Sequence, residues 1–269
     1  MPGALPTMTF LRSLAFNVLF YLNLALRLIV LAPIFVFVSE ARGWRIVKAW
    51  ARSSLWLLDK VAGTRSLLTG QEHLPAGGVI VAAKHQSYWD VLVLVPELDR
   101  PTFILKKELM AVPLFGWFAR HMGMIPIDRS KRAGVLQAMT GAAHRAVEEG
   151  RQIVIFPEGT RTEPGAEATY RQGVFRLYEA LNLPVVPVAL NSGLYWPRRS
   201  LLRRPGTVRA EFLPAIAPGL GRAEFLDALR NAIESRTAEL VAEAVVRDGY
   251  GEEAAKRTAA RRRVDTPAA

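Results

Sequence analysis

The stretch "GVIVAAKHQSYWDVL", residues 78–92, joins a buried-strand pattern to a short polar cluster. Its first six residues are apolar without a break, which is typical of a strand covered on both faces of a sheet. His85 follows and stands five positions before Asp90, while Ser87 and Asp90 have the spacing of a capping box at a helix N-terminus. Asp90 therefore either holds the His85 ring or only caps a helix, and this stretch leaves both interpretations open.

The geometry of a helix limits how His85 and Asp90 can meet. On one continuous helix, side chains five residues apart diverge by about 140° around the axis. The pair forms only if His85 lies in a loop and Asp90 lies in the first turn of the helix that follows. Ser87 as the N-cap residue permits that arrangement, so that Asp90 can both serve the helix and hold the ring.

Short apolar runs alternate with helical patterns along the chain after Gly63. Six runs predict strands: "GVIVAA" (78–83), "TFIL" (102–105), "GMIPI" (123–127), "RQIVIF" (151–156), "PVVPVAL" (184–190) and "TVRAEFL" (207–213). Helices are predicted over 87–97, 113–122, 131–149, 171–182 and 222–247. We therefore expect one α/β domain over residues 63–248, with a mostly parallel central sheet flanked by helices.

Composition narrows the class of protein. The 269 residues include no cysteine, which excludes disulfides, thiol nucleophiles and cysteine zinc sites and fits a reducing, cytoplasmic environment. Lysine and arginine exceed aspartate and glutamate by 11, so we expect attraction to anionic surfaces. The hydrophobic fraction of 51% favours a phospholipid membrane. Because the basic residues are dispersed and form no nucleic-acid-binding module, we expect no nucleic acid partner.

The N-terminal residues 13–39 form an apolar stretch that contains one charge, Arg27. A spanning helix needs about 20 apolar residues, but Arg27 at mid-depth would cost about 2.5–3.5 kcal/mol. Pro33 would also break or kink the helix. We therefore expect two shorter helices that dip into one leaflet, with Arg27 reaching the headgroups; a single tilted span is the alternative. The stretch is too long for a cleaved signal peptide.

Residues 41–60 show a basic face opposite an apolar face when placed on a helical wheel. The basic residues are Arg42, Arg45, Lys48 and Arg52, and the opposite side holds Trp44, Val47, Trp50, Ala51 and Leu58. This pattern favours a helix lying in the membrane interface over a soluble helix packed on the domain. We expect residues 1–62 to be membrane-associated helices, with this basic segment and the domain behind it facing the cytoplasm. Residues 249–269 are expected to be a basic, disordered tail.

Polar residues follow several of the predicted strands. They are His85, Lys106, Arg129 and the loop Glu158, Gly159, Thr160 and Arg161. Because ligands of open α/β sheets gather at the carboxyl ends of strands, we expect these side chains to share one site. His73, His121 and His144 lack the spacing of metal ligands and are interpreted as structural or exposed. No metal site is expected.

Four stretches, in this order, resemble the conserved blocks of the glycerolipid acyltransferases. "HQSYWD" matches their H-x4-D motif, and "GMIPIDR", "FPEGTR" and "VVPVAL" resemble their second, third and fourth blocks, over roughly residues 65–215. The resemblance implies a glycerol-3-phosphate acyltransferase-like α/β fold with an N-terminal two-helix membrane-inserting motif. The pattern looks most like the bacterial branch that converts lysophosphatidic acid to phosphatidic acid.

The sequence departs from the family pattern at two places. Lys84 stands where the family often has asparagine, and Tyr170-Arg171-Gln172-Gly173 stands where it often has Phe-Lys-x-Gly. We interpret the first departure as a cation beside the histidine. It leaves another lysolipid, such as lyso-ornithine lipid, as an alternative acceptor.

The implied reaction moves a fatty acyl group from acyl-CoA or acyl-carrier protein to the free hydroxyl of 1-acyl-glycerol 3-phosphate. His85 would take the hydroxyl proton and Asp90 would fix the ring tautomer, with no acyl-enzyme and no cofactor beyond the acyl donor. Arg161, then Arg129 and Lys106, would bind the phosphate. Glu158, Gly159 and Thr160 belong to the same loop as Arg161 and complete the implied substrate site. Glu158 would hydrogen-bond to the glycerol or to Arg161, and the Gly159 amide would stabilise the oxyanion.

Several alternatives stay open from the sequence. Arg129 could pair only with Asp128, and Lys106 could be a solvated surface charge. Residues 112–124 are apolar enough to line an acyl-chain groove but equally suit the core. A catalytically inactive membrane-binding protein with the same fold is the alternative from a different functional class.

Overall fold

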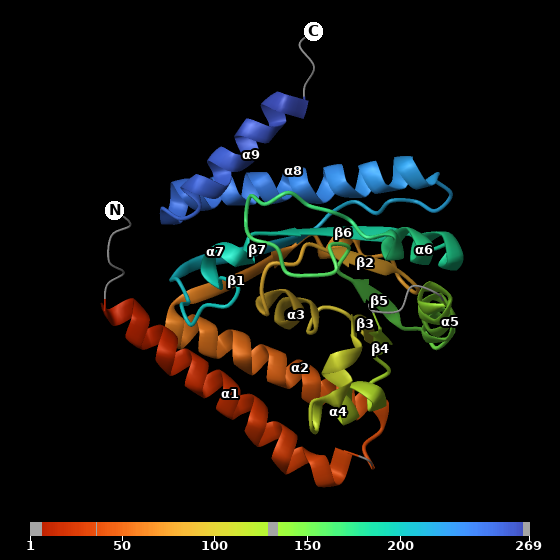
Figure 1. The fold of residues 1–269 in the computed structure, drawn as a ribbon. Helices are drawn as coiled ribbons and strands as arrows, with labels where there is room; N and C mark the ends of the chain where they lie inside the picture. The colour runs from red at the N-terminus through yellow and green to blue at the C-terminus, as the bar shows by residue number, and fades with distance from the viewer. Residues whose placement is uncertain (1–6, 36, 129–133, 266–269) are drawn as a thin grey trace.

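A seven-stranded mixed sheet lies between two layers of helices (Figure 1). The structure is a computed structural model that describes residues 7–35, 37–128 and 134–265. The strand order is β1-β7-β6-β2-β5-β3-β4. The strands are β1 (Thr64–Thr69), β2 (Ile80–Ala83), β3 (Pro101–Lys106), β4 (Ile125–Ile127), β5 (Gln152–Ile155), β6 (Val185–Leu190) and β7 (Gly206–Phe212).

The α-helices divide between the two faces of the sheet. They are α1 (Thr7–Phe35), α2 (Glu40–Leu57), α3 (Trp89–Leu94), α4 (Phe115–His121), α5 (Val135–Glu148), α6 (Gln172–Leu181), α7 (Ser192–Tyr195), α8 (Arg222–Asp248) and α9 (Glu252–Asp265). Helices α1 to α4 lie on one side, and α5, α6 and α8 lie on the other (Figure 1). Short π and 3-10 turns cover Leu58–Ala62, Gln71–His73 and Lys107–Ala111.

The sheet confirms the mostly parallel arrangement that the sequence predicts. Strands β6, β2, β5, β3 and β4 pair in parallel, and the carboxyl ends of β2, β3, β4, β5 and β6 therefore share one edge. Strand β7 runs antiparallel to β6, and β1 pairs in parallel with β7. Each of the six predicted strands is present. The sequence analysis missed β1, because "TRSLLT" has no continuous apolar run and most of its side chains are only half-buried.

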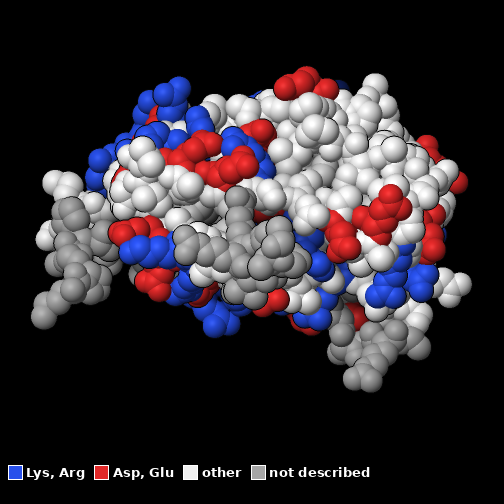
Figure 2. Space-filling model, turned by 90° about the horizontal axis from the view of Figure 1, so that it is seen from above, with Lys and Arg blue, Asp and Glu red and all other residues white. Residues whose placement is uncertain are grey.

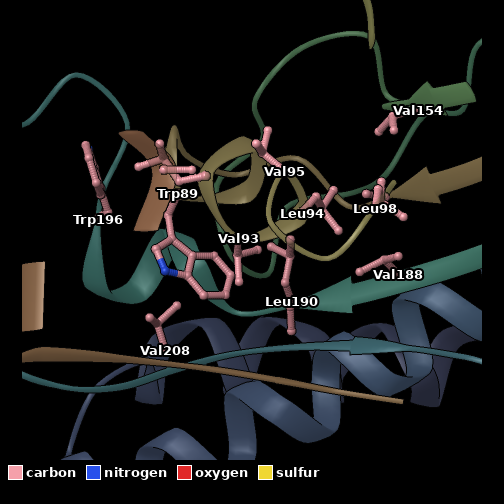
Figure 3. Packing of buried hydrophobic residues seen from close by; sticks show 14 of the residues in the cluster. Trp89, Val93, Leu94, Val95, Leu98, Val154, Val188, Leu190, Trp196 and Val208 are labelled. Carbon is pink, nitrogen blue, oxygen red and sulfur yellow. The ribbon is translucent and has the colours of Figure 1, made fainter. Parts of the chain in front are cut away.

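The alternation of side chains along β2 separates two hydrophobic cores. Val81 and Ala83 pack in the core beneath α1, α2 and α3, whereas Ile80 and Ala82 pack with α5, α6 and α8. The first core includes the indole of Trp89, which lies near Val93, Leu190 and Val208 (Figure 3). Its Nε1 also donates to Ser66 Oγ at 2.8 Å, so the start of α3 is fixed both by packing and by a hydrogen bond to β1.

Helix α1 is one continuous helix, which corrects the expectation of two shorter ones. Pro33 falls within its last turn, where few hydrogen bonds remain to be disrupted. The segment Thr7–Pro33 is long and apolar enough to cross a membrane, and only 17% of its most apolar window is buried. Arg27 does not extend outward as expected, because its Nε donates to Asn23 Oδ1 at 3.0 Å and its Nη2 reaches Ser53 Oγ of α2 at 3.4 Å.

Helix α2 packs its apolar face on the domain, so the expectation that this face enters the membrane is wrong. Trp44 and Ala51 are buried beside the core that contains α3. Arg42, Arg45 and Arg52 are exposed on the opposite face. The separation of basic and apolar residues on this helix was predicted correctly. The apolar face, however, packs on the domain, as in the alternative of a soluble amphipathic helix.

The C-terminal segment, expected to be disordered, is helical over α9. Ala254 of α9 is buried, and its backbone packs closely on Gly165. The contact is so close that a side chain at position 165 would lie within 3 Å of the Ala254 backbone. The start of α9 is therefore held against the loop that precedes α6, which explains why the segment is ordered there.

Candidate active site

His85 and Asp90 form the hydrogen-bonded pair that the H-x4-D spacing suggested. His85 Nδ1 lies 2.9 Å from Asp90 Oδ2. His85 is in the loop after β2, and Asp90 is in the first turn of α3, which is the one arrangement that the helix geometry allows. The pairing leaves Nε2 as the ring nitrogen that can accept a proton. The ring also stacks on Phe156, which follows β5, at a centroid separation of 4.0 Å.

The Asp90 carboxylate is buried and accepts hydrogen bonds from several donors at once. Its Oδ2 accepts the backbone N–H groups of Gln86 at 2.7 Å and Ser87 at 2.9 Å. Its Oδ1 accepts the hydroxyl of Ser87 at 3.2 Å and that of Ser192 at 2.5 Å. The carboxylate therefore holds both the imidazole and the loop before α3. The N-cap residue of α3 is Tyr88 and not the predicted Ser87, and among the described residues no side chain caps this helix, so the capping-box interpretation is wrong.

Ser192 is a site residue that the sequence analysis missed. It lies at the start of α7, directly after β6, and it is fully buried. Nothing in its local sequence connects it to Asp90, which is 102 positions earlier. Only the adjacency of β6 and β2 in the sheet brings the two together.

The Glu158 side chain points into the protein and is hydrogen-bonded to the backbone of His85, directly and through Thr162. Its Oε1 accepts the His85 N–H at 3.3 Å, and its Oε2 accepts the Thr162 hydroxyl. The Thr162 N–H in turn donates to the His85 carbonyl at 2.8 Å. Glu158 is 3% exposed and makes no hydrogen bond to Arg161, so the expectation of an Arg161 partner is wrong. Its observed contacts position the histidine instead.

Lys84 lies beneath the sheet and away from the His85 ring. Its side chain is 2% exposed, and its Nζ lies 3.1 Å from Glu158 Oε1 and 2.8 Å from Glu234 Oε1 on α8. The expectation of a cation available beside the base is therefore wrong. The alternating directions of β2 continue for two residues past the strand, so Lys84 and His85 lie on opposite sides.

Arg161 offers an accessible cation next to this pair. Its guanidinium lies over the Tyr88 ring, 4.4 Å from the centroid, and the residue is only half-buried. Within residues 7–35, 37–128 and 134–265 it has no carboxylate within ion-pair distance. Stacking on an aromatic face leaves the guanidinium edge open to an anionic ligand.

The other two cations predicted to bind phosphate are Lys106 and Arg129. Lys106 ends β3 at the shared edge of the sheet and is exposed. Its neighbour Lys107 pairs with Asp128 at 3.2 Å. Arg129 lies outside the described residues, so its predicted contact with phosphate stays a prediction.

The Gly159 amide is already used inside its own loop. Its N–H donates to the Phe156 carbonyl at 2.9 Å, closing a turn in which Gly159 has φ of +69°. The expectation that this amide is free for an oxyanion is therefore wrong for this conformation. The positive φ explains the glycine, because other residues rarely adopt it. Thr160 follows with an exposed side chain.

The remaining candidates divide between core and surface. In the stretch 112–124, Phe118 and Met122 belong to the core, while Val112 and Leu114 are exposed. His121 and His144 are exposed, and His73 is half-buried. Among the described residues, no group of three or more histidine, aspartate or glutamate side chains could hold a metal ion.

Comparisons with known proteins show to which family a chain with this fold and this pair belongs. The family model described as Acyltransferase matches residues 65–191. A 1-acyl-sn-glycerol-3-phosphate acyltransferase of Pseudomonas aeruginosa is 33% identical over 233 residues, covering 84% of this chain and 90% of that protein. This chain therefore belongs to the acyltransferase family.

More distant relatives share parts of the chain. A 1-acyl-sn-glycerol-3-phosphate acyltransferase of Saccharomyces cerevisiae is 30% identical, covering 57% of this chain and 52% of its own length. The crystal structure of the 1-acyl-sn-glycerophosphate acyltransferase PlsC from Thermotoga maritima superposes with a TM-score of 0.70 at 20% identity. The alignment covers 87% of this chain and 98% of that one, which establishes the shared fold.

Proposed function

We propose that this acyltransferase converts 1-acyl-glycerol 3-phosphate to phosphatidic acid at a membrane surface. The observation that carries the proposal is the His85–Asp90 hydrogen bond at the carboxyl end of β2, with Arg161 close by on Tyr88. The names of the relatives support lysophosphatidic acid as the acceptor.

The hydrogen bond to Asp90 determines which nitrogen of the His85 ring is left to accept a proton. Because Asp90 Oδ2 acts as an acceptor toward the neighbouring N–H groups, we assign the hydrogen of the pair to His85 Nδ1. Nε2 is left with a lone pair and acts as the general base. When the ring becomes an imidazolium, the same carboxylate stabilises it.

The transfer needs no nucleophile from the protein. The acceptor hydroxyl oxygen attacks the thioester carbonyl carbon while its proton passes to Nε2, forming the ester C–O bond. The C–S bond then breaks, and the leaving thiolate takes up a proton from the imidazolium. The thioester of acyl-CoA or acyl-carrier protein serves as donor, and general-base action of this kind contributes about 10²–10⁴-fold.

Arg161 is the proposed anchor for the acceptor phosphate, and we propose that Lys106 and Arg129 add positive charge for the same phosphate. Its guanidinium fork matches two phosphate oxygens, and binding there would place the glycerol near His85. Thr160, beside it, offers an exposed hydroxyl to the same headgroup.

Membrane association is proposed to run through α1. Its outward face carries Leu22, Leu26 and Ile29, which are 59%, 64% and 63% exposed. An apolar surface of this extent is rare on a soluble monomer and is typical of a membrane contact. The exposed basic face of α2 would meet anionic headgroups, with the domain on the cytoplasmic side of a bacterial inner membrane.

An acceptor panel tests the proposed function. Purified protein in lipid nanodiscs is given lysophosphatidic acid, lyso-ornithine lipid or glycerol 3-phosphate, each with labelled acyl-CoA or acyl-carrier protein. We expect label in phosphatidic acid from the first acceptor only. Label in the ornithine lipid alone would contradict the proposed acceptor, and no transfer with any pair would favour the inactive membrane-binding alternative.

A further inference from the structure

The two departures from the family pattern meet at one carboxylate. Lys84 Nζ lies 2.8 Å from Glu234 Oε1, and the Tyr170 hydroxyl donates to the same oxygen at 2.9 Å. Lys84 follows β2, Tyr170 precedes α6, and Glu234 lies in the middle of α8. Because Lys84 and Tyr170 share this partner, we interpret the three residues as one unit.

Through Lys84, the unit contacts the buried carboxylate of Glu158 in the candidate site. Lys84 Nζ also contacts Glu158 Oε1 at 3.1 Å, where the side chains of Lys84 and Glu158 are 2% and 1% exposed. One ammonium group therefore lies between two carboxylates. An ionised carboxylate in such a place requires a charge partner, because few water molecules reach it.

Glu158 passes the effect on to the histidine through two backbone contacts. The oxygen that touches Lys84 also accepts the His85 N–H. The other oxygen accepts the Thr162 hydroxyl, and Thr162 donates its N–H to the His85 carbonyl. Both backbone polar groups of His85 are thus fixed by Glu158 and Thr162.

The charges around Glu158 act in opposite directions. Burial raises the pKa of the Glu158 carboxyl, Lys84 and Thr162 lower it, and Glu234 raises it. Burial and the nearby carboxylates also raise the pKa of Tyr170 well above its ordinary value, so it remains a neutral donor to Glu234. Arg230, on α8, is the further charge on this side, 5.8 Å from the Tyr170 ring.

We propose that Lys84, Glu234 and Tyr170 form a positioning unit that locks Glu158 against the backbone of His85. Lys84 takes no part in binding the acceptor. This inference rests on the proposed role of His85 in acyl transfer. It assigns to α8 a function in the site that the motifs do not contain.

The test compares Lys84→Met with the wild-type protein in nanodiscs, using lysophosphatidic acid and the preferred donor. We expect kcat at neutral pH to fall by at least about tenfold, with the acceptor KM within about twofold. Without the ammonium group Glu158 takes up a proton more easily, so the acid limb of the kcat profile should move to higher pH. Wild-type turnover establishes the proposed function separately.

A second carboxylate variant distinguishes an electrostatic role from simple packing. Glu234→Gln removes the charge that raises the pKa of Glu158, so the acid limb should move to lower pH. In the double variant Lys84→Met with Glu234→Gln, kcat should recover at least about threefold over Lys84→Met. Glu243→Gln is the matched control, because Glu243 has similar exposure on α8 but pairs with Arg209 and Arg236. Its profile should match the wild type.

The outcomes separate clearly. A Lys84→Met enzyme with kcat within twofold and an unmoved pH profile would overturn the proposal, and so would a rise in acceptor KM at unchanged kcat. No recovery in the double variant would also overturn it. If Lys84→Met does not fold, Glu234→Gln decides alone: a shifted acid limb supports the unit, and a profile equal to that of Glu243→Gln rejects it.

Discussion

The buried Asp90 carboxylate orients the His85 ring and also fixes the loop that leads into α3. Oδ2 holds the loop before α3 and the His85 ring, while Oδ1 is fixed by Ser87 and Ser192. The donors prevent the carboxylate from rotating. As a result the imidazole has one orientation, set by α3 and by Ser192 at the start of α7.

Asp90→Asn tests the catalytic half of this role. The amide oxygen can still accept from the loop amides of Gln86 and Ser87, so we expect the loop before α3 to keep its conformation. The charge that stabilises the imidazolium is lost, and kcat should fall by about 10²-fold or more. Turnover and thermal melting should be measured together. If the melting temperature falls while kcat per folded molecule is unchanged, Asp90 serves only to hold the loop before α3.

Arg161→Ala tests the proposed phosphate contact. Removing the guanidinium should raise KM for lysophosphatidic acid by about 10–100-fold, the usual consequence of losing a charge-assisted pair. KM for the acyl donor should change little. Steady-state kinetics with each substrate varied in turn give both constants. Equal increases for the two substrates would remove the phosphate role from Arg161.

At the residue level, local spacing predicted the His85–Asp90 pair but not its surroundings. Ser192 and Glu234 were missed because they come from distant parts of the chain. Lys84 was expected beside the histidine, although extending the alternation of β2 by two residues would have separated it from His85. The Gly159 amide was assigned to an oxyanion because a sequence does not reveal which amides already have partners.

At the scale of elements, one carboxylate fastens α2 to the sheet. Glu40, in the first turn of α2, bonds Arg100 at 2.7 Å and 3.0 Å and lies 3.1 Å from Arg151. These arginines immediately precede β3 and β5. Burial alone would raise the pKa of Glu40, but the bonds to Arg100 and Arg151 hold it below its ordinary value of 4.5.

This pairing makes a prediction about stability and pH. Because the folded pKa of Glu40 is depressed, its contribution is present above pH 4.5 and is lost as the pH falls through the folded pKa. At neutral pH, Glu40→Gln should cost on the order of 1 kcal/mol, since the pair is partly exposed. Melting curves in detergent from pH 7 to pH 3 should show the two proteins converging on the acid side. A constant difference across this range would contradict the assignment.

Most elements of the domain could be predicted from apolar periodicity, and the exceptions have physical causes. Strand β1 lacks an apolar run because it lies at the edge of the sheet beside β7. Pro33 favoured a prediction of two shorter helices, but only two residues of α1 follow it, so it does not divide the helix. Helix α9 was missed because its Ala- and Arg-rich composition resembles a solvated tail, yet its first turn packs on the loop before α6.

At the scale of the whole molecule, the two outer helical layers differ in character. The α8 side carries both signs of charge next to one another (Figure 2), including the Arg236 contacts with Glu211 and Glu239. The opposite side presents the apolar surface of α1. This asymmetry is what a protein docked on a membrane by one face requires.

Replacing part of that apolar surface should release the protein from lipid. Each of Leu22, Leu26 and Ile29 contributes about 1–2 kcal/mol when buried, so the triple lysine variant should lose at least about tenfold in binding to anionic vesicles. Flotation of the purified proteins measures this. Val246→Lys is the control, because Val246 is 89% exposed on α8. Equal flotation of the triple variant and wild type would exclude α1 as the contact.

The most direct test of the whole account is the turnover of His85→Ala with lysophosphatidic acid in nanodiscs. The His85 side chain is 19% exposed and contacts Phe156 and Asp90 at the edge of the sheet, so we expect the melting temperature to change little. We predict that kcat falls by about 10²–10⁴-fold. A folded variant that keeps more than about a tenth of wild-type turnover would contradict the assignment of His85 as the base.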